Sequence, residues 1–185
     1  LPRTEQGILV VPITSLMQRI TPTNWIAGHV LDLRVGQKFD LGLERLQLQR
    51  FGYRHVPQVM DCGDFSIRGA ILDLYPSGAK MPLRIELMDD EIDSLRMFDP
   101  ETQRSEASQD YFKLLPAREF PLDAQSCKLA REQLLDRFDI NPRTCGLYAD
   151  LKEGVAPAGI EYYLPLFFEQ TSNLLDYLPA QVNVF

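Results

Sequence analysis

The stretch that decides the fold of this chain reads Gly63-Asp64-Phe65-Ser66-Ile67-Arg68-Gly69-Ala70-Ile71-Leu72-Asp73-Leu74-Tyr75-Pro76. It is the longest run of strand-favouring residues in the sequence, and a glycine and a proline bound it, as is common for strands. Its apolar residues fall at odd positions up to Ile67 but at even positions from Leu72, so one regular strand cannot keep a single face buried. We therefore predict a β-bulge near Gly69. The bulge would restore one buried face, made of Phe65, Ile67, Leu72 and Leu74.

The opposite face of this predicted strand carries Arg68, Asp73 and Tyr75. Arginine and tyrosine are enriched where protein partners dock, so these side chains form a candidate recognition surface. The alternative is a twisted strand whose outer face is simply hydrated, and residue types alone favour that alternative.

Composition indicates a folded chain without membrane segments or bound metal. Its 185 residues, 45% of them hydrophobic, fit one large domain or two small ones. No segment approaches the roughly 18 consecutive apolar residues of a membrane span, and no signal peptide is apparent. Because the chain begins at Leu1 rather than at methionine, we expect it to be part of a longer protein. Cys62, Cys127 and Cys145 lack metal-ligand spacing, which favours reduced thiols in a cytoplasmic protein without metal or cofactor.

Charge argues for a protein partner rather than for nucleic acid. The net charge is −7, and residues 88–185 alone carry nine basic and eighteen acidic side chains. Nucleic-acid binding by the chain alone is disfavoured, because it depends on a basic surface that displaces counterions from phosphates. A nearly neutral middle next to an acidic end is compatible with protein recognition.

The flanks of the chain show α/β patterns. Residues 7–12 predict a short buried strand, and the apolar spacing of residues 13–20 predicts an amphipathic helix directly after it. No glycine-rich phosphate loop accompanies them. Asp123 is expected to cap a helix that extends to about Phe138 and buries Cys127, Ala130 and Leu134, and a second helix should run from Pro142 to near Gly154. Residues 159–168 are expected in the core, and residues 180–185 resemble a strand.

The middle of the chain predicts a sheet with one packed helix. Residues 28–35 alternate as a strand, and Asp40 should cap a helix over residues 41–51 that ends at Gly52. We expect Leu43, Leu46 and Arg50 to form one stripe of this helix, with Leu48 and Phe51 beside it. A turn at residues 76–79 should lead into strands over residues 83–87 and 92–98. Residues 101–109 are expected to be a strand-free connector, and residues 111–118 a further strand.

Acidic and histidine residues of the middle segment offer two weaker alternatives. Asp89-Asp90-Glu91 lies on a predicted turn, where neighbouring carboxylates point apart, so a hydrated turn is favoured over a metal site. An enzyme would need His55, Asp61 and Asp64 as acid and base groups, but the sequence supplies no nucleophile at a supporting spacing. Lone histidines such as His55 and His29 are more often surface or packing residues. We therefore assign no catalytic residue.

The opening stretch also resembles a known module. The pattern comprises Gly63-Asp64-Phe65-x-Ile67-Arg68-Gly69-x-Ile71-Leu72-Asp73-Leu74-Tyr75-Pro76, Leu83-Arg84-Ile85-Glu86-Leu87, Asp89-Asp90-Glu91-Ile92-Asp93 and Phe98-Asp99-Pro100-x-Thr102. It is similar to the module that the bacterial excision-repair protein UvrB shares with the transcription-repair coupling factors. The coupling factors are favoured over UvrB itself by Val11-Pro12-Ile13-Thr14-Ser15-Leu16-Met17-Gln18-Arg19, Phe51-Gly52-Tyr53-Arg54-His55-Val56 and Pro157-Ala158-Gly159-Ile160-Glu161-Tyr162-Tyr163.

This resemblance implies a fold and a domain plan. The fold would be α/β (α+β), with a small mixed or antiparallel sheet domain and a packed helix inserted into the remnant of a helicase-type, P-loop NTPase-like domain. Residues 1–25 would end the first segment of that helicase-like domain, residues 26–100 would form the inserted UvrA-binding domain, and residues 101–185 would return to the helicase-like domain. The family's ATP-dependent DNA translocase lies in another part of the whole protein, so this part would be non-catalytic.

The resemblance also implies a partner and a site. Its implied role is an adaptor in a bacterial cytoplasm that binds UvrA and so recruits nucleotide excision repair to stalled RNA polymerase. The polymerase and DNA would be contacted by other parts of the whole protein, and other domains of that protein are further partners. Arg68, Arg84 and Glu86 match contact positions of the family, and Arg54 and His55 lie where UvrB has an Ala-Arg pair. Asp73 and Tyr75 complete the expected face, whereas Ser66 departs from the arginine of UvrB. The alternative is a fragment of UvrB, the damage-verifying subunit.

Overall fold

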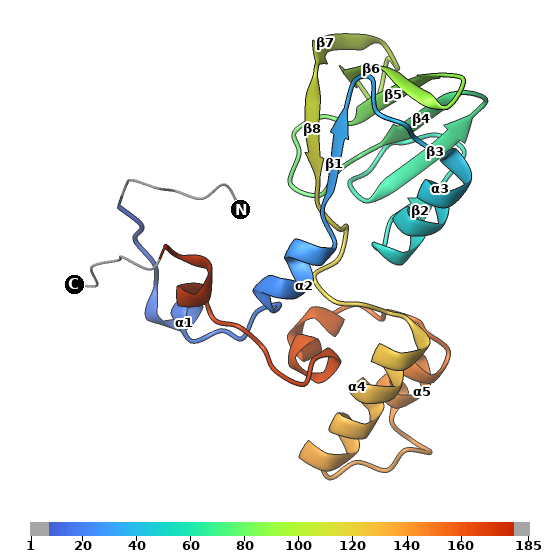
Figure 1. Ribbon diagram of the computed structural model, residues 1–185. Helices are drawn as coiled ribbons and strands as arrows, with labels where there is room; N and C mark the ends of the chain where they lie inside the picture. The colour runs from blue at the N-terminus through green and yellow to red at the C-terminus, as the bar shows by residue number, and fades with distance from the viewer. Residues whose placement is uncertain (1–7, 180–185) are drawn as a thin grey trace. The chain divides into compact units, whose positions relative to one another are not determined.

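The computed structural model describes residues 8–179 (Figure 1). The chain divides into two compact units, one formed by residues 28–121 and the other by residues 1–27 together with residues 122–185. The first boundary lies close to the expected one after residue 25. The expected boundary after residue 100 falls inside the first unit, because the following residues pair with strands of that unit.

The first unit contains a six-stranded sheet in the order β2-β3-β4-β5-β6-β7. Its strands are β2 (Arg54–His55), β3 (Asp64–Arg68), β4 (Ile71–Leu74), β5 (Leu83–Met88), β6 (Glu91–Phe98) and β7 (Ser105–Gln109). β2 and β3 are parallel and all later neighbours are antiparallel. A separate pair joins β1 (Leu31–Arg34) to β8 (Tyr111–Leu114). The α/β class and the mixed sheet predicted from the sequence are confirmed.

The predicted bulge near Gly69 is wrong, because the chain turns back at this point. Arg68 lies opposite Ile71, so Gly69 and Ala70 form a two-residue hairpin turn, and Gly69 has a φ of 62°. Glycine adopts positive φ without steric cost, which suits the tight turns that join twisted strands. The reversal shifts the phase of the apolar residues while keeping them on one face, with Phe65 opposite Leu74 and Ile67 opposite Leu72. The predicted buried face is therefore confirmed.

Helix α3 (Leu41–Arg50) begins and ends as predicted. The Asp40 carboxylate accepts hydrogen bonds from the backbone N–H groups of Gly42 (2.8 Å) and Leu43 (3.1 Å), which satisfies donors that the first turn leaves free. Gly52 follows the helix with a φ of 88°, the left-handed conformation that terminates many helices.

The buried stripe of α3 differs from the predicted one. Leu43 and Leu46 are mostly exposed, at 65% and 55%, whereas Leu48 and Phe51 are buried in the core of the sheet. The inward stripe runs through positions 41, 44, 48 and 51, with the spacing of one helix face. Glu44 is the charged member of this stripe. Because of it, the apolar residues alone did not reveal which face of the helix is buried.

The polar segment expected to be a connector forms an edge strand. β7 pairs with β6, although its residues from Ser105 to Gln109 carry no alternating apolar side chains. An exposed edge strand does not require such alternation, because neither of its faces is fully covered. The hairpin of β5 and β6, with its acidic turn at Asp89 and Asp90, is as predicted.

The second unit is helical in the described residues 8–27 and 122–179. Its elements are α1 (Ile13–Leu16), α2 (Thr23–Gly28, which reaches one residue into the first unit), α4 (Ala124–Arg137), α5 (Gly146–Lys152) and the 3₁₀ helices η1 (Ile160–Phe167) and η2 (Leu174–Tyr177). Asp123 caps α4, and Cys127, Ala130 and Leu134 are buried, as predicted. The second helix starts at Gly146 rather than at Pro142.

The predictions for the first twenty residues are largely wrong. Residues 8–12 form no strand, and Ile8 is 94% exposed. The helix that follows has a single turn, Ile13–Leu16, and Ile20 instead pairs with Ser172 in an isolated bridge. A helicase-type sheet is absent from residues 8–27 and 122–179, and the strand expected at residues 180–185 lies outside the described residues. Within residues 8–179, no helix is long and apolar enough to cross a membrane.

Candidate protein-interaction surface

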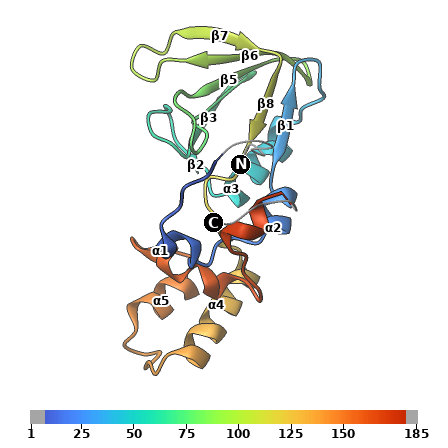
Figure 2. The ribbon, with the colours of Figure 1, turned by 90° about the vertical axis from the view of Figure 1, so that its left-hand side faces the viewer.

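The six-stranded sheet has one apolar and one polar face. Because alternate residues point to opposite sides, the strand register fixes which side chains share a face. On the polar face, one row contains Ser66, Asp73, Arg84, Arg96 and Ser108, and a second contains Arg68, Ile71, Glu86 and Ser94. A third row at the β2 end contains Arg54, Asp64 and Tyr75. These three rows are called the polar face below, and Figure 2 shows β5, β6 and β7, three of the strands that carry it, side by side.

The centre of the polar face is a buried carboxylate. Asp73 is 1% exposed, and its two oxygens accept hydrogen bonds from Arg84 Nε (2.7 Å), Arg84 Nη2 (2.9 Å) and Arg68 Nη2 (2.6 Å). The two bonds from Arg84 form the bidentate pairing in which guanidinium and carboxylate geometries match. Removing a carboxylate from water is costly unless its charge is paired, so Asp73 depends on both arginines.

Arg84 is committed to contacts within the chain. Its side chain is only 13% exposed, and the guanidinium lies over the ring of Phe98, 4.7 Å from the ring centre. Its Nη1 also donates to the Gln103 carbonyl oxygen (3.3 Å) and to Ser105 Oγ (3.4 Å). The hydrogen bond with Asp73 raises the pKa of Arg84 above its ordinary value. Arg84 therefore holds the segment after β6 against the sheet as well as neutralising Asp73.

Arg68 and Glu86 are more accessible than Asp73 and Arg84. Arg68 is half exposed and makes its hydrogen bond to Asp73 through a single nitrogen. Glu86 accepts a hydrogen bond from Ser94 Oγ (2.6 Å), and its Oε2 lies 3.9 Å from Arg96 Nε. Both side chains keep free surface through which a charged group of a partner could be bound.

Arg96 is a residue of the polar face that was not predicted from the sequence. It lies on the polar face directly opposite Arg84, and its side chain is 47% exposed. The strand pattern indicated its position, because Arg96 is two residues after Ser94 and so points to the same side of β6, and Ser94 lies opposite Glu86. Alternation alone could place it on this face, but only the register of β5 and β6 brings it beside Glu86.

The β2 end of the face gathers Arg54, Asp64 and Tyr75. Arg54 Nε donates a hydrogen bond to Asp64 Oδ1 (2.9 Å), the Nη2 of the same guanidinium lies 2.8 Å from that oxygen, and the Asp64 side chain is almost fully buried. The backbone N–H of Asp61 also donates to Asp64 (3.2 Å). Tyr75 donates its hydroxyl to the Lys80 carbonyl oxygen (3.1 Å). This end is a second, smaller group of predicted residues rather than part of the Asp73 cluster.

His55 is the predicted site residue that lies off the polar face. It pairs with Phe65, which belongs to the apolar face, and the two rings lie 5.1 Å apart. Asp64 points to the opposite side of the sheet and is occupied by Arg54. The structure therefore does not bring His55 and Asp64 together as the enzyme alternative would require.

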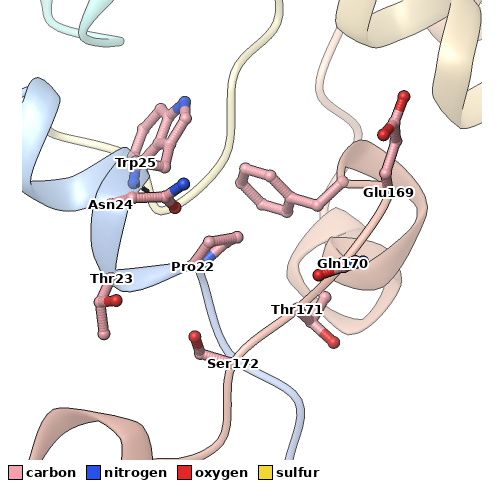
Figure 3. A pocket seen from close by; sticks show the side chains of 9 residues that line it. Pro22, Thr23, Asn24, Trp25, Glu169, Gln170, Thr171 and Ser172 are labelled. Atoms are coloured by element: carbon pink, nitrogen blue, oxygen red, sulfur yellow. Dashed lines mark hydrogen bonds between the residues drawn. The ribbon is translucent and has the colours of Figure 1, made fainter.

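A separate cavity lies within the helical unit (Figure 3). It has a volume of about 640 Å³ and opens beside the bridge between Ile20 and Ser172. Trp25 and Phe168 meet there edge to face with ring centres 5.9 Å apart. The remaining lining is mostly neutral and polar, with Glu169 as its charged member, so the cavity offers no paired acid and base groups.

Comparison with known proteins matches the sheet unit to a described domain family. Residues 31–120 match the UvrB interaction domain, and this range lies within the sheet unit of residues 28–121. The chain is 44% identical to the transcription-repair-coupling factor of Escherichia coli (strain K12) over 97% of its length. It is 41% identical to that of Haemophilus influenzae over 96% and 33% identical to that of Myxococcus xanthus over 92%.

The chain belongs to the transcription-repair-coupling factor family. It spans 16% of the length of the Escherichia coli and Haemophilus influenzae relatives and 15% of the Myxococcus xanthus relative. The alternative of a UvrB fragment is not favoured, since these relatives are coupling factors. Every predicted site residue lies inside the matched range, and so does Arg96.

Proposed function

We propose that this chain is a non-catalytic adaptor module that binds UvrA through the polar face. Binding would recruit nucleotide excision repair to RNA polymerase that has stalled on damaged DNA. The observation that carries the proposal is the buried Asp73 under Arg84 and Arg68, which fixes a charged surface within the range matched by the UvrB interaction domain. The names of the coupling-factor relatives support the repair context.

The geometry suits recognition because the charged groups are already ordered before a partner arrives. An arginine on a loop loses rotamer freedom when it binds, whereas Arg84 is already held by Asp73, Gln103 and Ser105. Preordered charges also favour correct register and faster association with a surface of complementary charge. The polar face would therefore select a partner by its charge pattern.

The predicted residues divide into contact and supporting roles. Arg68 and Glu86 would contact UvrA directly, since both retain exposed surface. Asp73 and Arg84 would support them from below, with Arg84 reaching the partner only through its small exposed part. Arg54 and Tyr75 would extend the interface toward β2, and His55 would lie at its rim.

The rest of the longer protein would supply the remaining activities. Residues 1–25 and the part of the chain after the sheet unit would belong to a helicase-like domain without ATPase function. DNA translocation, RNA polymerase binding and DNA contact would lie in parts outside this chain. The module itself would act in the bacterial cytoplasm.

The test is the affinity of the 185-residue chain for purified UvrA, measured by calorimetry. The double variant Arg68→Ala with Arg84→Ala should bind UvrA at least tenfold more weakly, because truncating interface arginines commonly costs more than about 1.4 kcal/mol. Arg45→Ala is the matched control, since Arg45 is exposed on α3, which packs on the apolar face. Unchanged affinity in a folded double variant would rule out the polar face as the binding site.

A further inference from the structure

Arg96 is the arginine of the polar face with the weakest contacts to other described residues. Arg54 makes two short contacts with Asp64, Arg68 makes one with Asp73, and Arg84 makes several. Arg96 has a single ionic contact among the described residues, the 3.9 Å approach of its Nε to Glu86. That separation is beyond hydrogen-bonding range, so little internal interaction would be lost if the Arg96 side chain turned to a partner.

The position of Arg96 is unfavourable for the isolated sheet. Arg96 lies directly opposite Arg84, and like charges in directly opposed positions of antiparallel strands destabilise the pair. Asp73 neutralises Arg84 but is fully engaged by Arg84 and Arg68. Glu86, the nearest acid, already accepts the hydrogen bond of Ser94. Among the described residues, the long contact with Glu86 is therefore the one ionic interaction by which Arg96 could stabilise the fold.

We propose that Arg96 is a further partner-contact residue, which pairs with a carboxylate of the protein bound by the polar face. This inference rests on the proposed function, because it names an additional contact of the same site. Arginine is enriched at protein interfaces and among the residues that contribute most to binding, and the Arg96 side chain is 47% exposed. Its planar guanidinium can bind a carboxylate through two hydrogen bonds.

The distance between Arg68 and Arg96 predicts the spacing of acidic groups on the partner surface. Arg68 lies on β3 and Arg96 on β6, three strand spacings apart across the sheet and one row apart along the strands, which corresponds to roughly 16 Å between the two positions. Ile71 and Glu86 lie on the two strands between them, in the same row as Arg68. The complementary surface therefore carries two acidic groups about that far apart, with a hydrogen-bond donor or a basic group between them that faces Glu86. A uniformly acidic or uniformly basic surface would not match.

A purely structural role for Arg96 makes a different prediction. If Arg96 served to hold Glu86, its removal would lower the stability of the chain. If it serves the partner, Arg96→Ala should leave the unfolding midpoint unchanged or raise it, because the repulsion with Arg84 is relieved, while binding weakens. Functional residues often show this opposition between stability and activity.

The experiment compares Arg96→Ala, Arg96→Lys and the control Arg45→Ala in the 185-residue chain, by thermal unfolding and by calorimetric titration with UvrA. We expect about tenfold weaker binding for Arg96→Ala, an intermediate loss for Arg96→Lys because the bidentate geometry is lost, and no change for Arg45→Ala. The affinity of Arg96→Ala should also depend less steeply on salt than that of the unsubstituted chain.

Three outcomes would overturn the proposal or separate it from the proposed function. If Arg96→Ala binds normally while the double variant of Arg68 and Arg84 does not, Arg96 is not a contact and the proposed function stands. If neither binds more weakly, the proposed function itself fails. If Arg96→Ala lowers both stability and affinity, and Arg96→Lys restores stability without a loss of affinity, the role of Arg96 is structural.

Discussion

The two faces of the six-stranded sheet shield their central side chains from water in different ways. Leu72 and Asp73 are neighbours on β4, and each is only 1% exposed. Leu72 is covered by apolar side chains of the core, whereas Asp73 is covered by Arg84 and Arg68. The buried side chains of the apolar face are not accessible to a binding partner. The arginines on the polar face protect the carboxylate and still present charge to the solvent.

This difference explains why one strand can serve both fold and recognition. Alternation lets β4 point Leu72 and Leu74 into the core while Asp73 organises the opposite surface. Stability should therefore depend most on the apolar face, and binding should depend on the polar face. Residues such as Asp73 should affect both, because a buried charge supports the fold only while its arginines remain in place.

The largest expected effect is on the apolar face. Leu72→Ala should lower the free energy of unfolding by about 3 kcal/mol, since it removes buried methyl groups and leaves a cavity between close-packed strands. Chemical denaturation with unchanged slope would measure the loss. The folded fraction should bind UvrA with normal affinity. A loss of affinity beyond the unfolded fraction would show that the two faces are not independent.

Asp73→Asn should have the next largest effect on stability. Asparagine keeps the shape of the side chain but removes the charge that two guanidinium groups share, at a cost of about 2 kcal/mol in the free energy of unfolding. Unlike Leu72→Ala, this variant should also weaken UvrA binding in the folded state, because Arg68 loses its anchor. Denaturation and calorimetry on the same sample separate the two effects. Full stability would contradict the supporting role of Asp73.

Gly69→Ala tests the hairpin that replaced the predicted bulge. Nothing lies within 4 Å of a Cβ at this position, so the cost arises from the positive φ of 62° alone. We expect a loss of about 1 kcal/mol in the free energy of unfolding. Gly146→Ala is a control, because Gly146 also has open space and opens helix α5 without positive φ. Equal changes in the two variants would indicate that the turn conformation does not contribute.

The polar and apolar faces could be predicted from sequence because alternation is a local property. Phe65, Leu72 and Leu74 were assigned to the core even though the hairpin between them was taken for a bulge. A bulge and a two-residue turn shift the phase of apolar residues alike, and only strand pairing distinguishes them. For the same reason, Arg96 could not be linked to Glu86 before the register was known.

Other predictions were wrong because a single residue interrupted a pattern, or because the position of a segment in the fold determined its structure. β7 is an edge strand with a polar sequence, so hydrophobic alternation gave no signal. Residues 8–12 have the composition of a buried strand, but all of them except the partly buried Val11 are exposed. In α3, the charge of Glu44 interrupts the inward stripe and directed the prediction toward Leu43 and Leu46 on the outer side.

Glu44→Gln should have the smallest effect and of the opposite sign. Burial, and secondarily the nearby Asp40, raises the pKa of Glu44 above its ordinary value of 4.5, and its Oε2 has no hydrogen-bond partner within the described part of the chain. Since the folded state binds this proton more tightly than the unfolded state, the group stabilises the fold at low pH, and that contribution is lost as pH rises through the folded pKa.

At neutral pH the neutral glutamine should therefore raise the unfolding free energy, by less than about 0.5 kcal/mol because the site is half solvated. The difference from the unsubstituted chain should shrink as pH falls toward 4.5, where Glu44 becomes protonated and resembles glutamine. Thermal unfolding of both chains at several pH values measures it, and UvrA affinity should not change. A constant difference across pH would mean that the ionised carboxylate is not the source of the penalty on the apolar face.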